Sequence, residues 1–136
     1  MSVQARWALI ALVVVCFGSH WLIRSAERRA YLASAGEHIL TLQRDLSPQA
    51  RAEAAFNLGR GRWEDEHAVS ALAKSLTEDP DSRVREACAH ALHRLGKRAA
   101  SAVPALCEAE NDGNRDVRKA ANSALASIRD ALRETR

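Results

Sequence analysis

The sequence predicts an all-α fold: a short α-solenoid of about two and a half helical pairs that follows one transmembrane helix. Three observations predict it. A pattern recurs about every 33–34 residues in the C-terminal two-thirds of the chain, the apolar residues there follow a helical period, and an uncharged apolar run lies near the N-terminus. Aromatic residues make up only 4% of the chain, so alanine, leucine and valine must form most of the core.

The first predicted element is a membrane anchor within residues 1–25. The run from Trp7 to Ile23 contains no Asp, Glu, Lys or Arg, and Arg6 and Arg24 flank it. As a helix it would be about 26 Å long, slightly short of a hydrocarbon core of about 30 Å. Trp7 and Trp21 lie near its ends, where aromatic residues favour the membrane interface. These features favour an uncleaved anchor in the lipid bilayer over a cleaved signal peptide or a buried core helix.

The flanking charges predict the orientation of this single-pass anchor. Arg24, Arg28 and Arg29 follow the run, whereas Arg6 alone precedes it. The positive-inside rule then places the rest of the chain in the cytoplasm. The alternative is a signal anchor that exports the segment after it, because the run starts so close to the N-terminus.

Residues 26–46 are predicted to form a helical linker that doubles as a degenerate first half-repeat. Leu42 and Asp45 stand 34 residues before Leu76 and Asp79, which matches the period of the later repeats. Gly36 is expected to break this helix.

The repeat domain proper is predicted at residues 47–136. Its first helix begins at Ser47-Pro48, a capping residue followed by proline at the first helical position, and ends near Gly59-Arg60-Gly61. The second helix runs from about Asp65 to Thr77, and Asp79-Pro80 ends it.

The second pair starts with a helix that Asp81 or Ser82 caps and that Gly96 ends. Ser101 is expected to cap the next helix, with Pro104 in its first turn. The two stripes that face the core consist of Val84, Ala87, Cys88, Ala91, Leu92 and Leu95 in one helix, and of Val117, Ala120, Ala121, Ala124, Leu125, Ile128 and Leu132 in the last helix. No later helix is predicted to cover the last stripe, so we expect a shortened cap, a partner or a second copy of the chain there.

The repeated residues resemble the HEAT repeat, in particular the short form of the phycobilisome-lyase-like bacterial HEAT proteins. The motif residues are Asp79, Val84, Arg85, Leu92, Asp112, Val117, Arg118 and Leu125. The resemblance covers Leu42 to Leu132, and it implies two layers of stacked helices that bind a protein partner.

Charged residues recur with the same period. Arg51, Arg85 and Arg118 repeat, and Asp79 and Asp112 repeat with them. Stacked helices are about 8–10 Å apart, so these side chains can form a charge ladder across the turns between repeats. An anion site on the three arginines is the alternative.

The candidate partner-binding surface consists of residues that fall outside the apolar stripes. Trp63 is its best single anchor because tryptophan is enriched at binding hot spots, although the alternative that it folds over its own helical pair is favoured. The surface comprises Trp63, Arg83, Glu86, His90, Arg94, Arg115 and Lys119.

The sequence predicts no metal, no cofactor and no catalytic residue. The acidic residues beside His67 suit the positive end of a helix better than a metal ion, and His90 and His93 lack further ligands at a suitable spacing. Cys88 and Cys107 are interpreted, like Cys16, as small buried residues, and a bridge between the first two stays open.

These observations predict a non-catalytic, membrane-anchored scaffold that mediates protein–protein interaction. The alternatives are a subunit of a lyase-type enzyme related to the bilin lyases, and an exported soluble binding protein after signal cleavage. Nucleic acid is not an expected partner, because acidic and basic residues nearly balance from Ser47 to Arg136 although the whole chain carries a formal net charge of +3.

Overall fold

The computed structural model describes residues 33–61 and 66–134, which are helical apart from short turns. The described residues from Ala35 onward form one compact unit. Within the described residues, no helix combines the length and the hydrophobicity that a membrane crossing requires. The anchor predicted at Trp7 to Ile23 lies outside the described residues.

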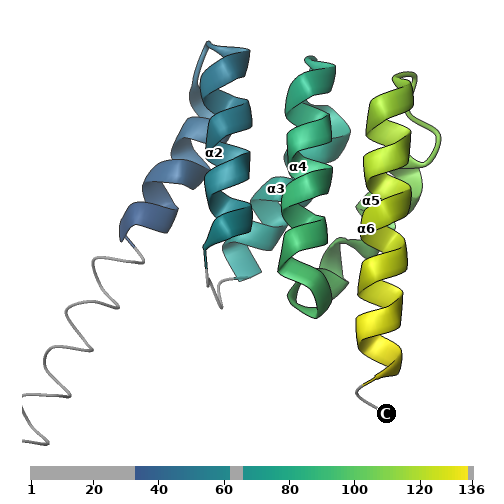
Figure 1. The fold of residues 1–136 in the computed structure, drawn as a ribbon. Helices are drawn as coiled ribbons and strands as arrows, with labels where there is room; N and C mark the ends of the chain where they lie inside the picture. Colours follow the sequence, from purple (N-terminus) through teal and green to yellow (C-terminus); the bar gives the residue numbers. More distant parts are fainter. Residues whose placement is uncertain (1–32, 62–65, 135–136) are drawn as a thin grey trace, which may run out of the picture. The chain divides into compact units, whose positions relative to one another are not determined.

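The helices stack in two layers (Figure 1). A helical segment at residues 33–44 comes first. It is followed by α2 (Pro48–Arg60), α3 (Glu66–Glu78), α4 (Ser82–Leu95), the 3-10 helix η1 (Gly96–Ala102), α5 (Val103–Ala109) and α6 (Arg115–Arg133). Helices α2, α4 and α6 pack side by side and form what we call the A layer. Segment 33–44, α3 and α5 take the alternate positions along the chain and form the B layer.

Polar side chains cap the three A-layer helices as the sequence predicts for the first two. Ser47 Oγ accepts a hydrogen bond from the amide of Ala50 at 3.4 Å, and Asp81 accepts one from the amide of Arg83 at 2.9 Å. Asn114 caps α6 in the same way. Each bond satisfies an amide that the first turn leaves unpaired, which fixes where the helix begins.

The predicted cap at Ser101 is wrong. Ser101 lies inside η1, and α5 starts at Val103 with no side-chain cap. The residue before α5, Ala102, already has right-handed helical backbone angles, so the 3-10 helix runs directly into α5 and no extended capping residue separates them.

The predicted break at Gly36 is also wrong, because residues 33–44 are continuously helical. A single glycine costs a helix only about 1 kcal/mol relative to alanine. Burial of Ala35 and Leu42 on the inner face of this segment offsets that cost.

The core is a continuous band of small and branched apolar side chains between the two layers. Its largest fully buried side chains are Leu42, Leu58, Leu72, Leu76, Leu92, Leu106, Leu125, Ile128, Val84, Val117 and Cys88. The expectation that the stripe of α6 lacks cover is wrong. From Val117 to Ile128 the stripe is buried against α4, α5 and η1, and only Leu132 at its end is exposed. The preceding A and B helices suffice, so a following helix is not needed.

Helices α2 and α4 approach each other most closely at Gly59. A Cβ atom at this position would lie 2.6 Å from the Cα atom of Ala91. Real side chains do not tolerate such a contact with backbone, so Gly59 sets the spacing of the first two A-layer helices. This role differs from a glycine that only ends a helix, since α2 continues through Gly59 to Arg60.

Candidate functional site

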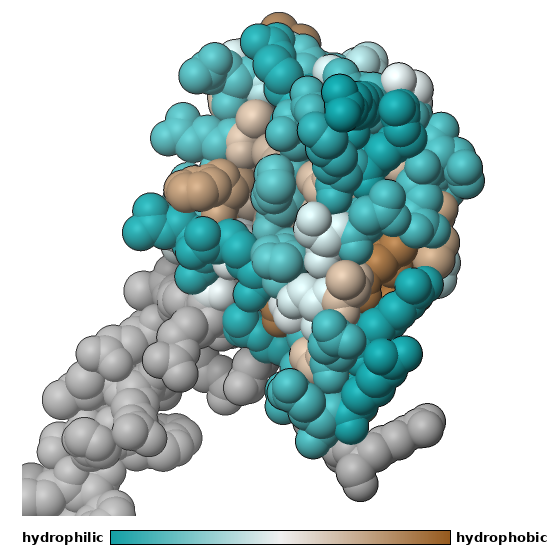
Figure 2. Space-filling view, turned by 45° about the vertical axis from the view of Figure 1, so that its right-hand side comes forward, coloured by the Kyte–Doolittle hydropathy of each residue, from teal (hydrophilic) through white to brown (hydrophobic). Residues whose placement is uncertain are grey.

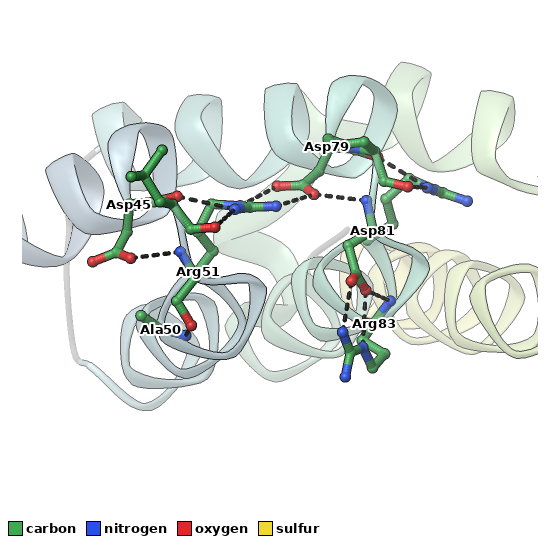
Figure 3. Close-up of polar contacts among 10 residues, drawn as sticks. Asp45, Ala50, Arg51, Asp79, Asp81 and Arg83 are labelled. Atoms are coloured by element: carbon green, nitrogen blue, oxygen red, sulfur yellow. Dashed lines mark hydrogen bonds and ion pairs between the residues drawn. The ribbon is translucent and has the colours of Figure 1, made fainter.

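The first rung of the charge ladder joins α2 to the end of α3. Arg51 donates from Nε to Asp79 Oδ2 at 2.8 Å and from Nη2 to Asp79 Oδ1 at 2.9 Å. Its Nη1 donates to the carbonyl of Asp45 at 2.9 Å (Figure 3). Both side chains are almost fully buried. The Arg51 guanidinium therefore links the turn before α2 to the turn after α3.

The second rung repeats this geometry one repeat later. Arg85 donates from Nε and Nη2 to the two carboxylate oxygens of Asp112 at 2.7 and 3.0 Å, and from Nη1 to the carbonyl of Asp79 at 2.9 Å. The hydrogen bonds from Arg85 lower the pKa of Asp112, and the carboxylate raises the pKa of Arg85 in turn. The donors of Arg51 and Arg85 are thus occupied within the fold, which argues against the alternative of an anion site on them.

Arg118 makes only half of a rung. Its Nη1 donates to the carbonyls of Asp112 at 2.7 Å and Gly113 at 3.1 Å, as the other two arginines do with their own turns. No carboxylate of the described residues pairs with it. The ladder therefore stabilises the two turns between repeats and ends in a guanidinium with donors to spare.

A groove lies on the A layer between α2 and α4. Its volume is about 480 Å³. The residues that line it are Phe56, Arg83, Glu86, Ala87, His90, Ala91, His93 and Arg94. Four residues of the predicted partner surface, Arg83, Glu86, His90 and Arg94, thus come together on α4. The described part of the face drawn in Figure 2 is mostly hydrophilic, with hydrophobic side chains in separate patches.

The central feature of this groove is Phe56, which the sequence reasoning missed. Its side chain is 48% exposed. The guanidinium carbons of Arg60 and Arg94 lie 5.5 and 5.8 Å from the centre of its ring, which is the geometry of a cation–π contact. A signal was present in the sequence. Phe56 stands at the position that His90 and Ser123 occupy in the next repeats, outside the apolar stripe.

The charged side chains around the groove differ in their contacts. Arg83 contacts Asp81 at 2.7 Å, and the hydrogen bonds from the side chain and backbone of Arg83 lower the pKa of Asp81 to about 2. Glu86 lies 3.7 Å from His90. Arg94 has no carboxylate partner in the part of the chain that the structure describes. It is the one groove arginine left to meet an acidic group from outside.

The other predicted surface residues lie elsewhere. Arg115 and Lys119 are exposed on α6 and do not line the groove, and Lys119 is 3.9 Å from Asp116. Trp63 lies outside the described residues. His93 shares the groove but also contacts the carbonyl of Ser123 on α6 at 3.1 Å through Nδ1, so it links neighbouring A-layer helices.

The structure answers the question of a bridge between Cys88 and Cys107. Cys88 and Cys107 are both free, with Cys88 buried and Cys107 half-buried. Burial raises the pKa of the Cys88 thiol, which keeps it protonated and unreactive. Among residues 33–61 and 66–134, no three His, Cys, Asp or Glu side chains gather where they could hold a metal ion.

The comparisons with known proteins agree with this architecture. A family model described as HEAT repeats matches residues 37–126. The chain belongs to the HEAT repeat family. No curated protein matches it. The matched range includes part of segment 33–44 and extends into α6, so it covers both rungs and the α2–α4 groove. HEAT repeats commonly mediate protein–protein interaction, which makes an exposed face of the stack the first place to look for a partner.

Proposed function

We propose that this HEAT repeat chain is a non-catalytic, membrane-anchored scaffold that binds a protein partner through the α2–α4 groove. The observation that carries the proposal is the half-exposed Phe56 at the groove, with two guanidinium groups over its ring. Aromatic and arginine side chains dominate binding hot spots because they combine a large apolar area with directed hydrogen bonds.

The lining of the groove favours a particular kind of partner segment. Ala87 and Ala91 leave room for a side chain beside Phe56, and the available space suits an aromatic or aliphatic group. Arg94 can donate hydrogen bonds to an aspartate or glutamate of the partner, because the neighbouring Glu86 contacts His90 instead. The preferred segment is therefore an apolar side chain next to an aspartate or glutamate.

The geometry of the ladder supports a role in binding. The bidentate pairs fix the turns between repeats, so α2 and α4 present the groove in a defined geometry before the partner arrives. A preformed surface reduces the conformational entropy lost on binding. Among the groove residues, no nucleophile lies beside a general base that a third side chain orients, so the groove gives no support for a lyase.

The groove proposal is tested by comparing full-length tagged variants in the native cell. Phe56→Ala and Arg94→Gln remove the ring and the cation, and Arg129→Gln removes an exposed arginine of α6 as the matched control. We expect a protein that co-purifies with the wild type and the control, and whose yield falls about tenfold or more with either groove variant. Equal yields of the same proteins from all four chains would refute the groove.

The membrane anchor and its orientation form the second part of the proposal. They rest on the uncharged run from Trp7 to Ile23 and on the arginines that follow it. We expect a C-terminally tagged chain in the membrane fraction, with the tag protected from protease until the cytoplasmic side is opened. A tag cut from the outer side would reverse the orientation, and a soluble, shortened product would favour an exported binding protein.

A further inference from the structure

The charge ladder has an open positive end on α6. Arg118 stands where Arg51 and Arg85 stand in the earlier repeats, and it makes the same backbone contacts through Nη1. In those repeats, Nε and Nη2 hold the carboxylate that follows the B-layer helix of the same pair. Among the described residues no such carboxylate reaches Arg118, which is half-buried.

The ladder also has an open negative end, at Asp45. This residue follows segment 33–44 as Asp79 follows α3. Its Oδ1 accepts a hydrogen bond from the amide of Ser47 at 2.8 Å, and Asp79 Oδ1 accepts the equivalent bond from the amide of Asp81 at 2.9 Å. The Asp45 carboxylate is thus oriented by the same turn as a rung carboxylate. It is exposed, and no guanidinium within the described part of the chain pairs with it.

We propose that the two open ends pair between copies of this chain, so that Arg118 of one copy receives Asp45 of the next and the solenoid continues head to tail. Among the described helices, the first, segment 33–44, belongs to the B layer, and the last, α6, belongs to the A layer. Segment 33–44 of the following copy would therefore take the B position beside α6, which preserves the alternation of the layers. The junction would reproduce the rungs already present inside the chain.

Apolar side chains near the two ends fit such a junction. Leu46, next to Asp45, is 96% exposed, and Leu40 is 51% exposed. On α5, the helix before α6, Val103 and Cys107 lie one turn apart, pack against the core and are half-buried. A single exposed ion pair contributes little to association, so burial of these apolar groups must supply most of the affinity while the rung sets the register.

A head-to-tail contact joins two different surfaces, which makes it testable by mixing. Asp45→Asn keeps the oxygen that accepts from Ser47 but removes the charge, and Arg118→Gln removes the guanidinium. Each variant alone has one damaged surface in every junction. A mixture of the two can still form one native junction, between Arg118 of the first variant and Asp45 of the second.

The measurement is co-capture of two differently tagged full-length copies in detergent micelles. We expect self-capture of the wild type, a loss of about tenfold in self-capture for each variant, and recovery when the two variants are mixed. Asp116→Asn, which removes an exposed carboxylate of α6, should leave self-capture unchanged.

Three results would overturn the head-to-tail junction: no self-capture of the wild type, self-capture of the variants as strong as that of the wild type, or a mixture as weak as either variant alone. Variants that capture themselves as well as the wild type does would point to association through the N-terminal region, which all these chains share. Circular dichroism at equal concentration checks that the variants remain folded. Because Phe56→Ala leaves both ladder ends intact, it should not change self-capture, so this result is independent of the groove proposal.

Discussion

At the scale of single residues, the difference between a complete rung and a half rung is the most informative contrast. Arg85 and Arg118 bind the backbone of their turns alike, but only Arg85 also holds a carboxylate among the described residues. Replacing one partner of a partly buried pair leaves the other without compensation. The two arginines therefore offer a matched test of what the carboxylate adds.

We expect Arg85→Gln to destabilise the fold by about 1.5–3 kcal/mol, because it leaves the Asp112 carboxylate without its partner and removes two charged hydrogen bonds. Arg118→Gln should cost clearly less, since it loses only backbone contacts. Urea denaturation of the two full-length variants at low protein concentration measures the difference. Equal losses of unfolding free energy would mean that the carboxylate contributes nothing.

The pKa of Asp112 predicts how the fold responds to acid. The hydrogen bonds from Arg85 lower this pKa in the folded state. The pair therefore stabilises the fold fully above the unfolded pKa of about 3.9, and this contribution is lost as the pH falls from there through the folded pKa. Asp112→Asn should be less stable than the wild type at pH 6 and should lose less stability between pH 5 and pH 2. Asp116→Asn, which removes an exposed carboxylate of α6, serves as the control.

The cysteines give a further prediction at this scale. Cys88 is buried and its thiol pKa is raised, whereas Cys107 is half-buried. A maleimide at neutral pH should therefore label Cys107 and spare Cys88 until denaturant is added. Peptide mapping by mass spectrometry distinguishes the two sites. Labelling of Cys88 in the native protein at the rate of Cys107 would show that the core opens readily.

At the scale of the elements, the close approach of α2 and α4 at Gly59 has a direct consequence for stability. Gly59→Ala places a methyl group against the backbone of Ala91 and should destabilise the fold by about 1–3 kcal/mol. Gly36→Ala is the matched control, because a Cβ there meets no atom within 4 Å. That change should stabilise segment 33–44 by about 0.5–1 kcal/mol. Thermal unfolding compares them, and two shifts in the same direction would contradict the packing described here.

The elements also show how far the sequence predicts this structure. The caps at Ser47 and Asp81, the end of α4 at Gly96 and the apolar stripes follow from local chemistry, so they were predictable. The direct passage from η1 into α5 was not, because it depends on the path that packing imposes on the chain after α4. Helicity through Gly36 was not predictable either, since burial of neighbouring residues outweighs the preference of one glycine.

The candidate site was predictable only in part. The position of four charged or polar residues of α4 outside its apolar stripe predicts that they are exposed, and they do line one groove. Phe56 was missed because it belongs to the other wall of that groove, on α2. Only the packing of α2 against α4 brings the two walls together, and repeat spacing alone does not reveal which exposed positions of neighbouring helices share a surface.

At the scale of the whole molecule, two features of the described unit suit a binding scaffold. The ladder fixes each repeat to the next, and the A layer presents a groove with an exposed aromatic ring. The face drawn in Figure 2 is mostly hydrophilic in its described part, which favours a small, specific contact there over a large hydrophobic one. The groove is therefore the part of this unit on which the account depends most.

The most direct test places a photo-crosslinking amino acid at position 90, inside the groove, and at position 129 on α6 as the control, in the full-length chain in its native cell. We expect a discrete protein adduct from position 90 that is absent from position 129 and that Phe56→Ala reduces about tenfold. Identical adducts from both positions, or none from position 90, would contradict the account of the groove as the partner site.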